Sequence, residues 1–168
     1  KGTGDAVPDN RPFPAGYSEF PWTPLPARDG RPQGGVRRSS SAANSSYFVN
    51  WTNRDDRMTW DVDVHTTGTY DVMIEYTCPV PDAGSTIELS FGNARLTGKV
   101  ADGWDPALYT NQDTLPRPPA ESQMKEFRPL ALGTIHLERG RGLLTLRALE
   151  IPGRQVMDVR RVNLTLRK

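Results

Sequence analysis

The chain has 168 residues with 21 basic and 20 acidic side chains, and its net charge is +1. This balance excludes a nucleic-acid-binding protein that relies on a strongly basic face. No apolar run approaches the roughly 20 residues of a membrane-spanning helix, and a single cysteine excludes an internal disulfide. Because the chain begins at Lys1 rather than Met, we expect it to be a piece of a longer, processed protein.

The N-terminal segment 1–35 is rich in proline, with seven of the 15 prolines of the chain. Proline removes a backbone donor and disfavours helices and central strands. The same segment carries large apolar side chains, which a free linker would lack: Phe13, Tyr17, Phe20, Trp22 and Leu25. We therefore predict an irregular Pro-rich arm over 1–35, lying on this domain or on a neighbouring one, and a folded domain over 36–168.

Alternation of apolar and polar residues begins after Tyr47 and continues through most of the chain. Apolar residues at every second position over 58–64 and 70–76, separated by a turn, predict a hairpin with one buried face. We interpret Gly140-Arg141-Gly142 as a second hairpin turn. Further strands are predicted over 87–91, 96–100, 133–137, 144–148 and 162–166, the second of them antiparallel to the first. Since no amphipathic helix is evident, these strands predict an all-β domain, a β-sandwich or jelly roll.

The sequence offers no combination of nucleophile and base that would indicate an enzyme. Motifs of serine hydrolases, zinc proteases and P-loop nucleotide-binding proteins are absent. His65 and His136 occupy polar positions of predicted strands, so we expect them to be exposed. Cys78 has no recognisable base beside it and is interpreted as a structural thiol. Asp61 and Asp63 share one face of a strand, where they would either bind a hard cation or form a solvated face.

Aromatic residues and one carboxylate stand out from the strand pattern. Trp104 and Tyr109 lie in the irregular segment 101–126, where they would either stack on the C–H face of a sugar ring or plug the edge of the sandwich. Asp158 interrupts the apolar stretch 156–159. A carboxylate in such a place needs a partner, which would be an arginine or a Ca²⁺ ion.

The spacing of four segments resembles carbohydrate-binding modules of families 6 and 35, which are galactose-binding-like jelly rolls. The segments are Asp56 to Val62, Gly68 to Tyr76, Gly142 to Leu146, and Met157-Asp158 ahead of the last strand. The resemblance covers about residues 36–167 and implies a domain that binds sugars. It also implies that Asp158 stands on the C-terminal side of a structural Ca²⁺ site. An aromatic residue often stands in these modules where this chain has Arg57.

A second resemblance covers nearly the whole chain, including the Pro-rich arm. The matching segments are Pro24 to Gly30, Asn50 to Thr52, Tyr76 to Pro79, Gly84 to Leu89, Phe127 to Leu130 and Ile151 to Asp158. They are similar to the C-terminal extension of secreted bacterial sulfatases, of the arylsulfatase and N-acetylgalactosamine-6-sulfatase type of planctomycetes. The resemblance implies a secreted or periplasmic location and the sulfatase catalytic domain as a partner. Cys78 lacks the proline and arginine that follow the catalytic residue of that family, so no catalytic role is carried over to it.

These observations predict a non-catalytic accessory domain that binds or positions a polysaccharide, sulfated or neutral. The alternative is a structural domain that docks on the catalytic domain and binds no ligand. For the binding site we predict stacking by Trp104 and Tyr109 and charge from Arg54 and Arg57. Alternatively, the two arginines simply neutralise the neighbouring carboxylates of a solvated loop. The only cofactor that we expect is a structural Ca²⁺ ion at Asp158.

Overall fold

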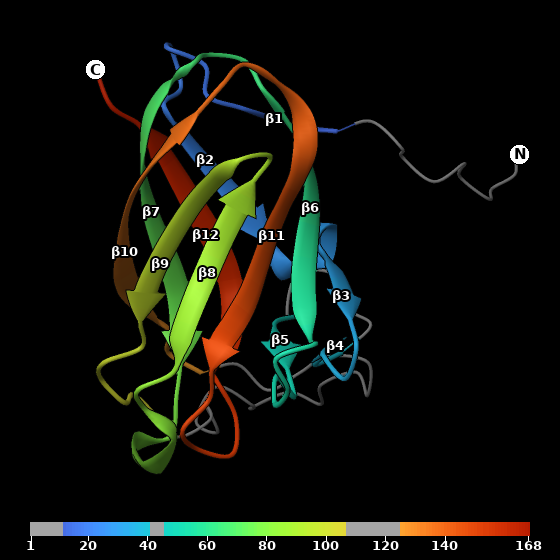
Figure 1. Cartoon of the computed structure of the whole chain (residues 1–168), viewed down its shortest axis with the longest axis vertical. Coiled ribbons are helices and arrows are strands. Elements are labelled where there is room, and N and C mark those ends of the chain that lie inside the picture. The colour runs from blue at the N-terminus through green and yellow to red at the C-terminus, as the bar shows by residue number, and fades with distance from the viewer. Residues whose placement is uncertain (1–11, 41–45, 107–124) are drawn as a thin grey trace, which may run out of the picture.

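The computed structural model describes residues 12–40, 46–106 and 125–168, which form two β-sheets packed face to face (Figure 1). The strands are β1 (Phe13–Ala15), β2 (Trp22–Pro26), β3 (Arg31–Gln33), β4 (Arg37–Arg38), β5 (Phe48–Val49), β6 (Arg57–Val64), β7 (Gly68–Thr77), β8 (Thr86–Phe91), β9 (Ala94–Lys99), β10 (Arg128–Leu137), β11 (Gly140–Glu150) and β12 (Asp158–Leu166). The described helical segments are the 3₁₀ turns η1 (Ala27–Asp29) and η3 (Val80–Asp82). No helix in these parts of the chain is long and apolar enough to cross a membrane.

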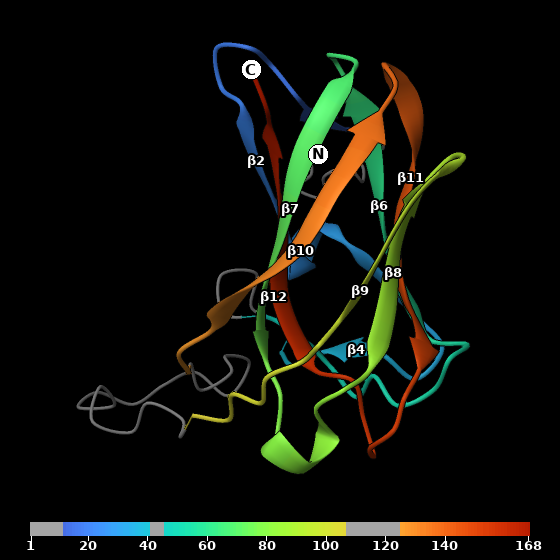
Figure 2. The ribbon, with the colours of Figure 1, turned by 60° about the vertical axis from the view of Figure 1, so that its left-hand side comes forward.

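The two sheets confirm the predicted all-β sandwich of jelly-roll type. In one of them, the β6 sheet, the strand order is β1-β6-β11-β8-β9, and β3 also pairs with β6. In the other, the β7 sheet, the order is β10-β7-β12-β5-β4, and β2 also pairs with β12. Strands β9 and β10 lie side by side although they belong to different sheets, and they close one edge of the sandwich (Figure 2).

The predicted hairpin over 58–64 and 70–76 is wrong. Strands β6 and β7 follow each other in the chain but lie in opposite sheets, and residues 65–67 cross between them. Gly140 to Gly142 likewise lie inside β11, which pairs with β6 rather than with β10. The alternation of apolar and polar residues identifies the buried face of a strand but not the strand with which it pairs. Strands β6 and β7 both turn their apolar faces toward one core. The antiparallel pair β8 and β9 was predicted correctly.

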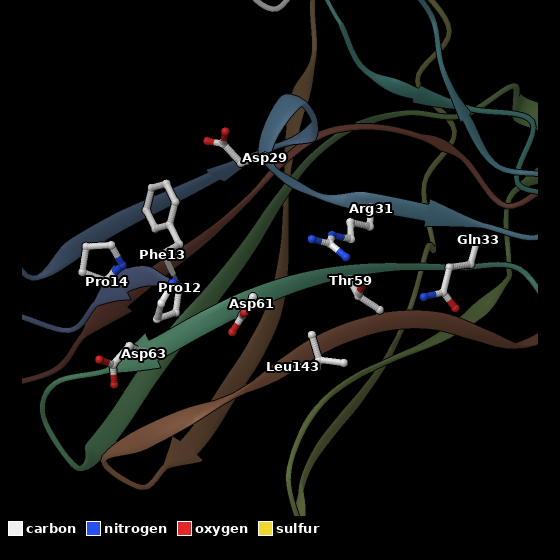
Figure 3. Close-up of a pocket in the computed structure, with 10 residues that line it drawn as sticks. All are labelled: Pro12, Phe13, Pro14, Asp29, Arg31, Gln33, Thr59, Asp61, Asp63 and Leu143. Carbon is white, nitrogen blue, oxygen red and sulfur yellow. The ribbon is translucent and has the colours of Figure 1, made fainter. Parts of the chain in front are cut away.

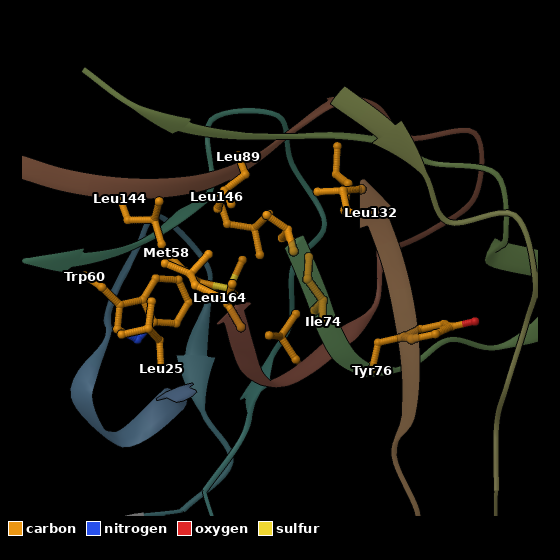
Figure 4. Close-up of a cluster of buried hydrophobic side chains, with 14 of the residues drawn as sticks. Leu25, Met58, Trp60, Ile74, Tyr76, Leu89, Leu132, Leu144, Leu146 and Leu164 are labelled. Carbon is orange, nitrogen blue, oxygen red and sulfur yellow. The ribbon is translucent and has the colours of Figure 1, made fainter. Parts of the chain in front are cut away.

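The core between the sheets contains the apolar residues that the alternation selects (Figure 4). In β6 and β7 these side chains are almost completely buried; they are Met58, Trp60, Val62, Val64, Tyr70, Val72, Ile74 and Tyr76. The intervening residues of each strand therefore point away from the core, on the outer faces of the two sheets.

The described part of the Pro-rich segment, residues 12–35, packs on this domain and is more regular than its proline content predicts. Strands β1 and β3 pair with β6, and β2 pairs with β12. Leu25 and Ala27 are fully buried in the core. The indole N–H of Trp60 donates a hydrogen bond of 3.0 Å to the carbonyl of Pro26. Proline is tolerated because these short strands pair along one side only. A boundary at residue 35 stays a prediction.

Candidate functional site

Trp104 lies beside the end of β7 and packs partly against the core. Its backbone pairs with that of Cys78, and its indole N–H donates a hydrogen bond of 2.9 Å to the carbonyl of Glu126. The guanidinium of Arg128 lies 3.9 Å from the centre of the indole ring. A sugar could therefore stack only on the ring face opposite Arg128. Tyr109, the other predicted stacking residue, lies outside the described residues.

The two predicted arginines lie at different places. Arg54 is exposed in the turn before β6 and lines a shallow depression of about 410 Å³ with Asn53 and Glu150. Arg57 begins β6, opposite Gln33 of β3. Trp104 is attached to the β7 sheet and Arg57 belongs to the β6 sheet, and a site shared by these two residues stays a prediction.

Asp56, which the two arginines were expected to neutralise, is bound by backbone groups instead. Its carboxylate accepts hydrogen bonds from the N–H groups of Gly35, Thr52 and Asn53, at 2.7 to 3.1 Å. The side chain is buried and ties the turn after β3 to the loop before β6. Its role is therefore to hold two loops together, which leaves Arg57 available for other contacts.

Asp158 has a cationic partner from the segment before β10. The ammonium group of Lys125 lies 2.7 Å from its carboxylate and also lies over the rings of Tyr47 and Phe127. Burial raises the pKa of the Asp158 carboxyl, and the hydrogen bond from Lys125 opposes that rise. In the described parts of the chain, no three or more His, Cys, Asp or Glu side chains are grouped to hold a metal. These residues do not fit a Ca²⁺ ion at Asp158, because the carboxylate is already paired with the ammonium group of Lys125.

Cys78 is fully buried, as expected of a structural thiol. Burial, together with the nearby carboxylates, Asp82 first among them, raises the pKa of this thiol to about 11. The sulfur lies 3.3 Å from the carbonyl oxygen of Val156. A thiol with such a pKa carries very little thiolate near neutral pH, so it is a poor nucleophile.

A groove of about 690 Å³ lies on the outer face of the β6 sheet and is here called the β6 groove (Figure 3). Its floor comes from β6 and β11, and its walls come from β1, β3 and the turn η1. The main lining residues are Phe13, Asp29, Arg31, Gln33, Thr59, Asp61, Asp63 and Leu143. The Pro-rich segment thus forms the walls of this groove.

The sequence of β6 explains the floor of this groove. Since Trp60 and Val62 point into the core, the alternate residues Thr59, Asp61 and Asp63 point outward. The register with β11 sets Leu143 opposite Asp61. Strands β1 and β3 both run along the free edge of β6, one beside residues 62–64 and the other beside 57–59. Together they give the groove two separate wall segments.

Charge in the groove is balanced at one end by an arginine of β11. Arg141 binds Asp61 through two hydrogen bonds of 2.8 and 3.1 Å. This hydrogen bonding lowers the pKa of the Asp61 carboxyl, and the positive charge of Arg31 contributes in the same direction. Asp61 is therefore ionised and already paired, which favours the solvated-face interpretation of Asp61 and Asp63 over a cation site.

The groove combines two kinds of surface. Carboxylates, a guanidinium, an amide and a hydroxyl supply hydrogen-bond donors and acceptors, while Phe13 and the 55% exposed Leu143 supply apolar surface. A sugar ring has the complementary pattern, with hydroxyl groups at its edge and C–H groups on its faces. The sequence placed Asp61 and Asp63 on one face, but nothing in it indicated that the arm would build the walls.

No family model and no curated protein matches the chain. Among solved structures, the C-terminal CBM6 of LamC, a marine laminarinase from Zobellia galactanivorans, is 10% identical with a TM-score of 0.58, over 86% of this chain and 98% of that one. The CBM35 of Cellvibrio japonicus Abf62 is 12% identical with a TM-score of 0.57, over 86% and 92% of the two chains. The Podospora anserina GH26-CBM35 β-(1,4)-mannanase is 15% identical with a TM-score of 0.58, over 88% of this chain and 28% of that one.

These likenesses show the fold. The chain spans 28% of the mannanase and 24% of the mosquito-larvicidal Cry4Aa toxin of Bacillus thuringiensis, which has the same fold in part at 12% identity and a TM-score of 0.62. It spans nearly the full length of the isolated CBM6 and CBM35 structures. The jelly roll of this chain is therefore the one that carbohydrate-binding modules of these two families have, as the sequence resemblance implied.

Proposed function

We propose that this domain is a non-catalytic module that binds a polysaccharide in the β6 groove. The observation that carries the proposal is the groove itself, in which a row of hydrogen-bonding side chains along β6 is bordered by apolar surface. Its volume of about 690 Å³ is that of a pocket for a small ligand. The shared fold with carbohydrate-binding modules supports the same conclusion.

The proposal extends to the protein in which the module works. The sequence resemblance to C-terminal extensions of secreted bacterial sulfatases supports a role as the accessory domain of such an enzyme, secreted or periplasmic. The module would hold the catalytic domain close to its polysaccharide, sulfated or neutral. A weak contact suffices for this purpose, because tethering raises the effective concentration of the enzyme at its substrate.

A groove substitution tests the binding proposal. Leu143→Gln removes an exposed apolar contact from the floor, so we expect affinity to fall about tenfold, by analogy with burial of a leucine-sized surface. The measurement is affinity gel electrophoresis against a panel of neutral, sulfated and uronate polysaccharides. Met73→Gln, a similar change at an exposed position on the outer face of the β7 sheet, is the matched control and should bind like the wild type.

Two outcomes of that experiment contradict the proposal. One is that no polysaccharide of the panel retards the wild-type domain at millimolar concentration. The other is that Leu143→Gln and Met73→Gln bind equally well, which would place the binding surface outside the groove.

The domain is expected to have no sulfatase activity of its own. Purified domain should hydrolyse an aryl sulfate no faster than the buffer does, with or without Ca²⁺, because Cys78 is buried with a raised pKa and lacks the sulfatase motif. Release of the phenol can be followed by absorbance. Turnover that disappears in Cys78→Ala would overturn this expectation.

A second candidate function, docking on a neighbouring protein domain, is favoured by a different surface. Tyr17 and Phe20 lie between β1 and β2, Trp22 is the first residue of β2, and the three side chains are 39%, 77% and 55% exposed. Aromatic residues are enriched in protein interfaces and often dominate their binding energy. If no polysaccharide binds, this surface is where a structural partner, such as a sulfatase catalytic domain, would pack.

A further inference from the structure

Two arginines stand directly opposite each other beside the β6 groove. Arg57 of β6 pairs in register with Arg147 of β11, and Gln33, which lines the groove, lies opposite Arg57 on the other side. Directly opposite residues on antiparallel strands project from the same face about 5 Å apart, so like charges in this position destabilise the sheet. A sheet that retains such a pair needs a counter-charge from somewhere.

The neighbouring carboxylate does not supply enough counter-charge. Glu88 of β8 accepts a hydrogen bond of 3.0 Å from Arg147 and also lies 3.9 Å from Arg95 of β9. One carboxylate is therefore shared by two guanidinium groups. Among the described residues, none has a carboxylate within 4.0 Å of Arg57, so its charge has no partner in this part of the chain.

A third arginine adds to this excess of positive charge. Arg31 of β3 stands opposite Thr59, diagonally next to Arg57, and projects into the groove. No carboxylate of the described chain lies within 4.0 Å of its guanidinium, although it contributes to the lowered pKa of Asp61. Arg31 lines the groove and Arg57 and Arg147 lie beside it; the three, here called the arginine end, lie on three adjacent strands with the hydroxyl group of Thr59 among them.

We propose that the arginine end binds an anionic substituent of the polysaccharide, a sulfate ester or a carboxylate. The guanidinium group matches such groups well, because its planar N–H fork donates two parallel hydrogen bonds to a pair of oxygens. This inference rests on the proposed function and specifies the class of polysaccharide: an acidic one.

The other end of the groove has the opposite character. Asp63 is exposed there, and Asp61 is ionised and bound to Arg141. Carboxylates repel an anionic group but accept hydrogen bonds from sugar hydroxyls. The two ends of the groove therefore differ in charge, and a bound sugar chain has one preferred orientation along β6. An acidic sugar lies over the arginine end, and the neighbouring sugar presents hydroxyl groups to the aspartates.

The test compares Arg57→Gln with Arg95→Gln. Both remove one positive charge from the outer face of the same sheet, but Arg95 lies on β9, separated from β11 by β8 and away from the groove. Binding of each variant is measured by isothermal titration calorimetry with a sulfated polysaccharide, the same polymer after desulfation, and a uronate polymer. The wild type should prefer an anionic polymer over the desulfated one at least tenfold, and Arg57→Gln should lose that preference while Arg95→Gln keeps it. Preference for the sulfated polymer would identify the substituent as a sulfate ester, and preference for the uronate polymer would identify it as a carboxylate.

The thermal stability of each variant is also measured without ligand. Because Arg57→Gln relieves the opposition to Arg147, its Tm should equal or exceed that of the wild type, which also shows that a loss of binding is not a loss of folding. If the wild type binds the desulfated polymer as tightly as the anionic ones, or if Arg95→Gln weakens binding as much as Arg57→Gln, the arginine end is not the subsite and the proposed function stands alone. If no polymer binds, both proposals are wrong.

Discussion

Trp60→Ala is expected to lower the free energy of unfolding by about 3–5 kcal/mol, the usual cost of removing a fully buried large aromatic side chain. Trp60 is 1% exposed and packs edge to face on Phe48, with ring centres 5.8 Å apart. Its indole N–H also binds the carbonyl of Pro26, so the substitution leaves both a cavity and an unpaired acceptor. Since this residue joins the Pro-rich segment to the core, the walls of the groove should loosen as well.

The measurement is equilibrium unfolding in guanidinium chloride, with limited proteolysis to follow cleavage within residues 12–35. Trp22→Ala is the matched control, because Trp22 also donates its indole N–H, to Asn163, but is 55% exposed. Trp22→Ala should lower the free energy of unfolding by less than about 1.5 kcal/mol, which is the usual contribution of one hydrogen bond and a partly buried side chain. Equal losses in the two variants would contradict the central packing role of Trp60.

Asp56→Ala is expected to lower the free energy of unfolding by about 3 kcal/mol. The buried carboxylate accepts three backbone hydrogen bonds, and hydrogen bonds to charged groups contribute about 1.5–3 kcal/mol each before relaxation and entry of water. Asp56→Asn should also destabilise the domain, because whichever way its amide is turned the NH₂ group would face at least one of these backbone N–H groups. Both changes loosen the start of β6, next to Arg57.

Thermal and chemical denaturation of these variants can be compared with Asp55→Ala. Asp55 is exposed in the same loop, and its substitution should change stability by no more than about 0.5 kcal/mol. A stable Asp56→Asn variant would show that the carboxylate is not needed to hold the two loops.

Alternation predicted the buried residues of the central strands well. Trp60, Ile74 and Leu146 lie in the core because hydrophobic burial depends on the period of a single strand. Strand pairing depends on the path of the chain between strands, and no local signal distinguishes a hairpin from a crossing between sheets. This is why β6 and β7 were assigned to one hairpin although residues 65–67 join opposite sheets.

The candidate site was predictable only in part, for a related reason. Because side chains alternate between the two faces of a strand, Asp61 and Asp63 could be placed on one outer face of β6. The same alternation puts Arg57 on that face. The walls could not be predicted, because proline content argues against strands and edge pairing overrides that tendency only in the folded structure. The contact between Trp104 and Arg128 depends on two distant segments meeting, which the sequence does not reveal.

Chemical-shift mapping can locate the surface on which this domain binds a polysaccharide. Backbone amide spectra of the ¹⁵N-labelled domain would be recorded while oligosaccharides of a retained polymer are added. Binding in the groove should place the largest shifts on β3, β6 and β11, around Thr59 and Leu143. Shifts confined to the loops 50–56 and 151–155 or to the aromatic segment 17–22, or no shifts at millimolar oligosaccharide, would contradict it.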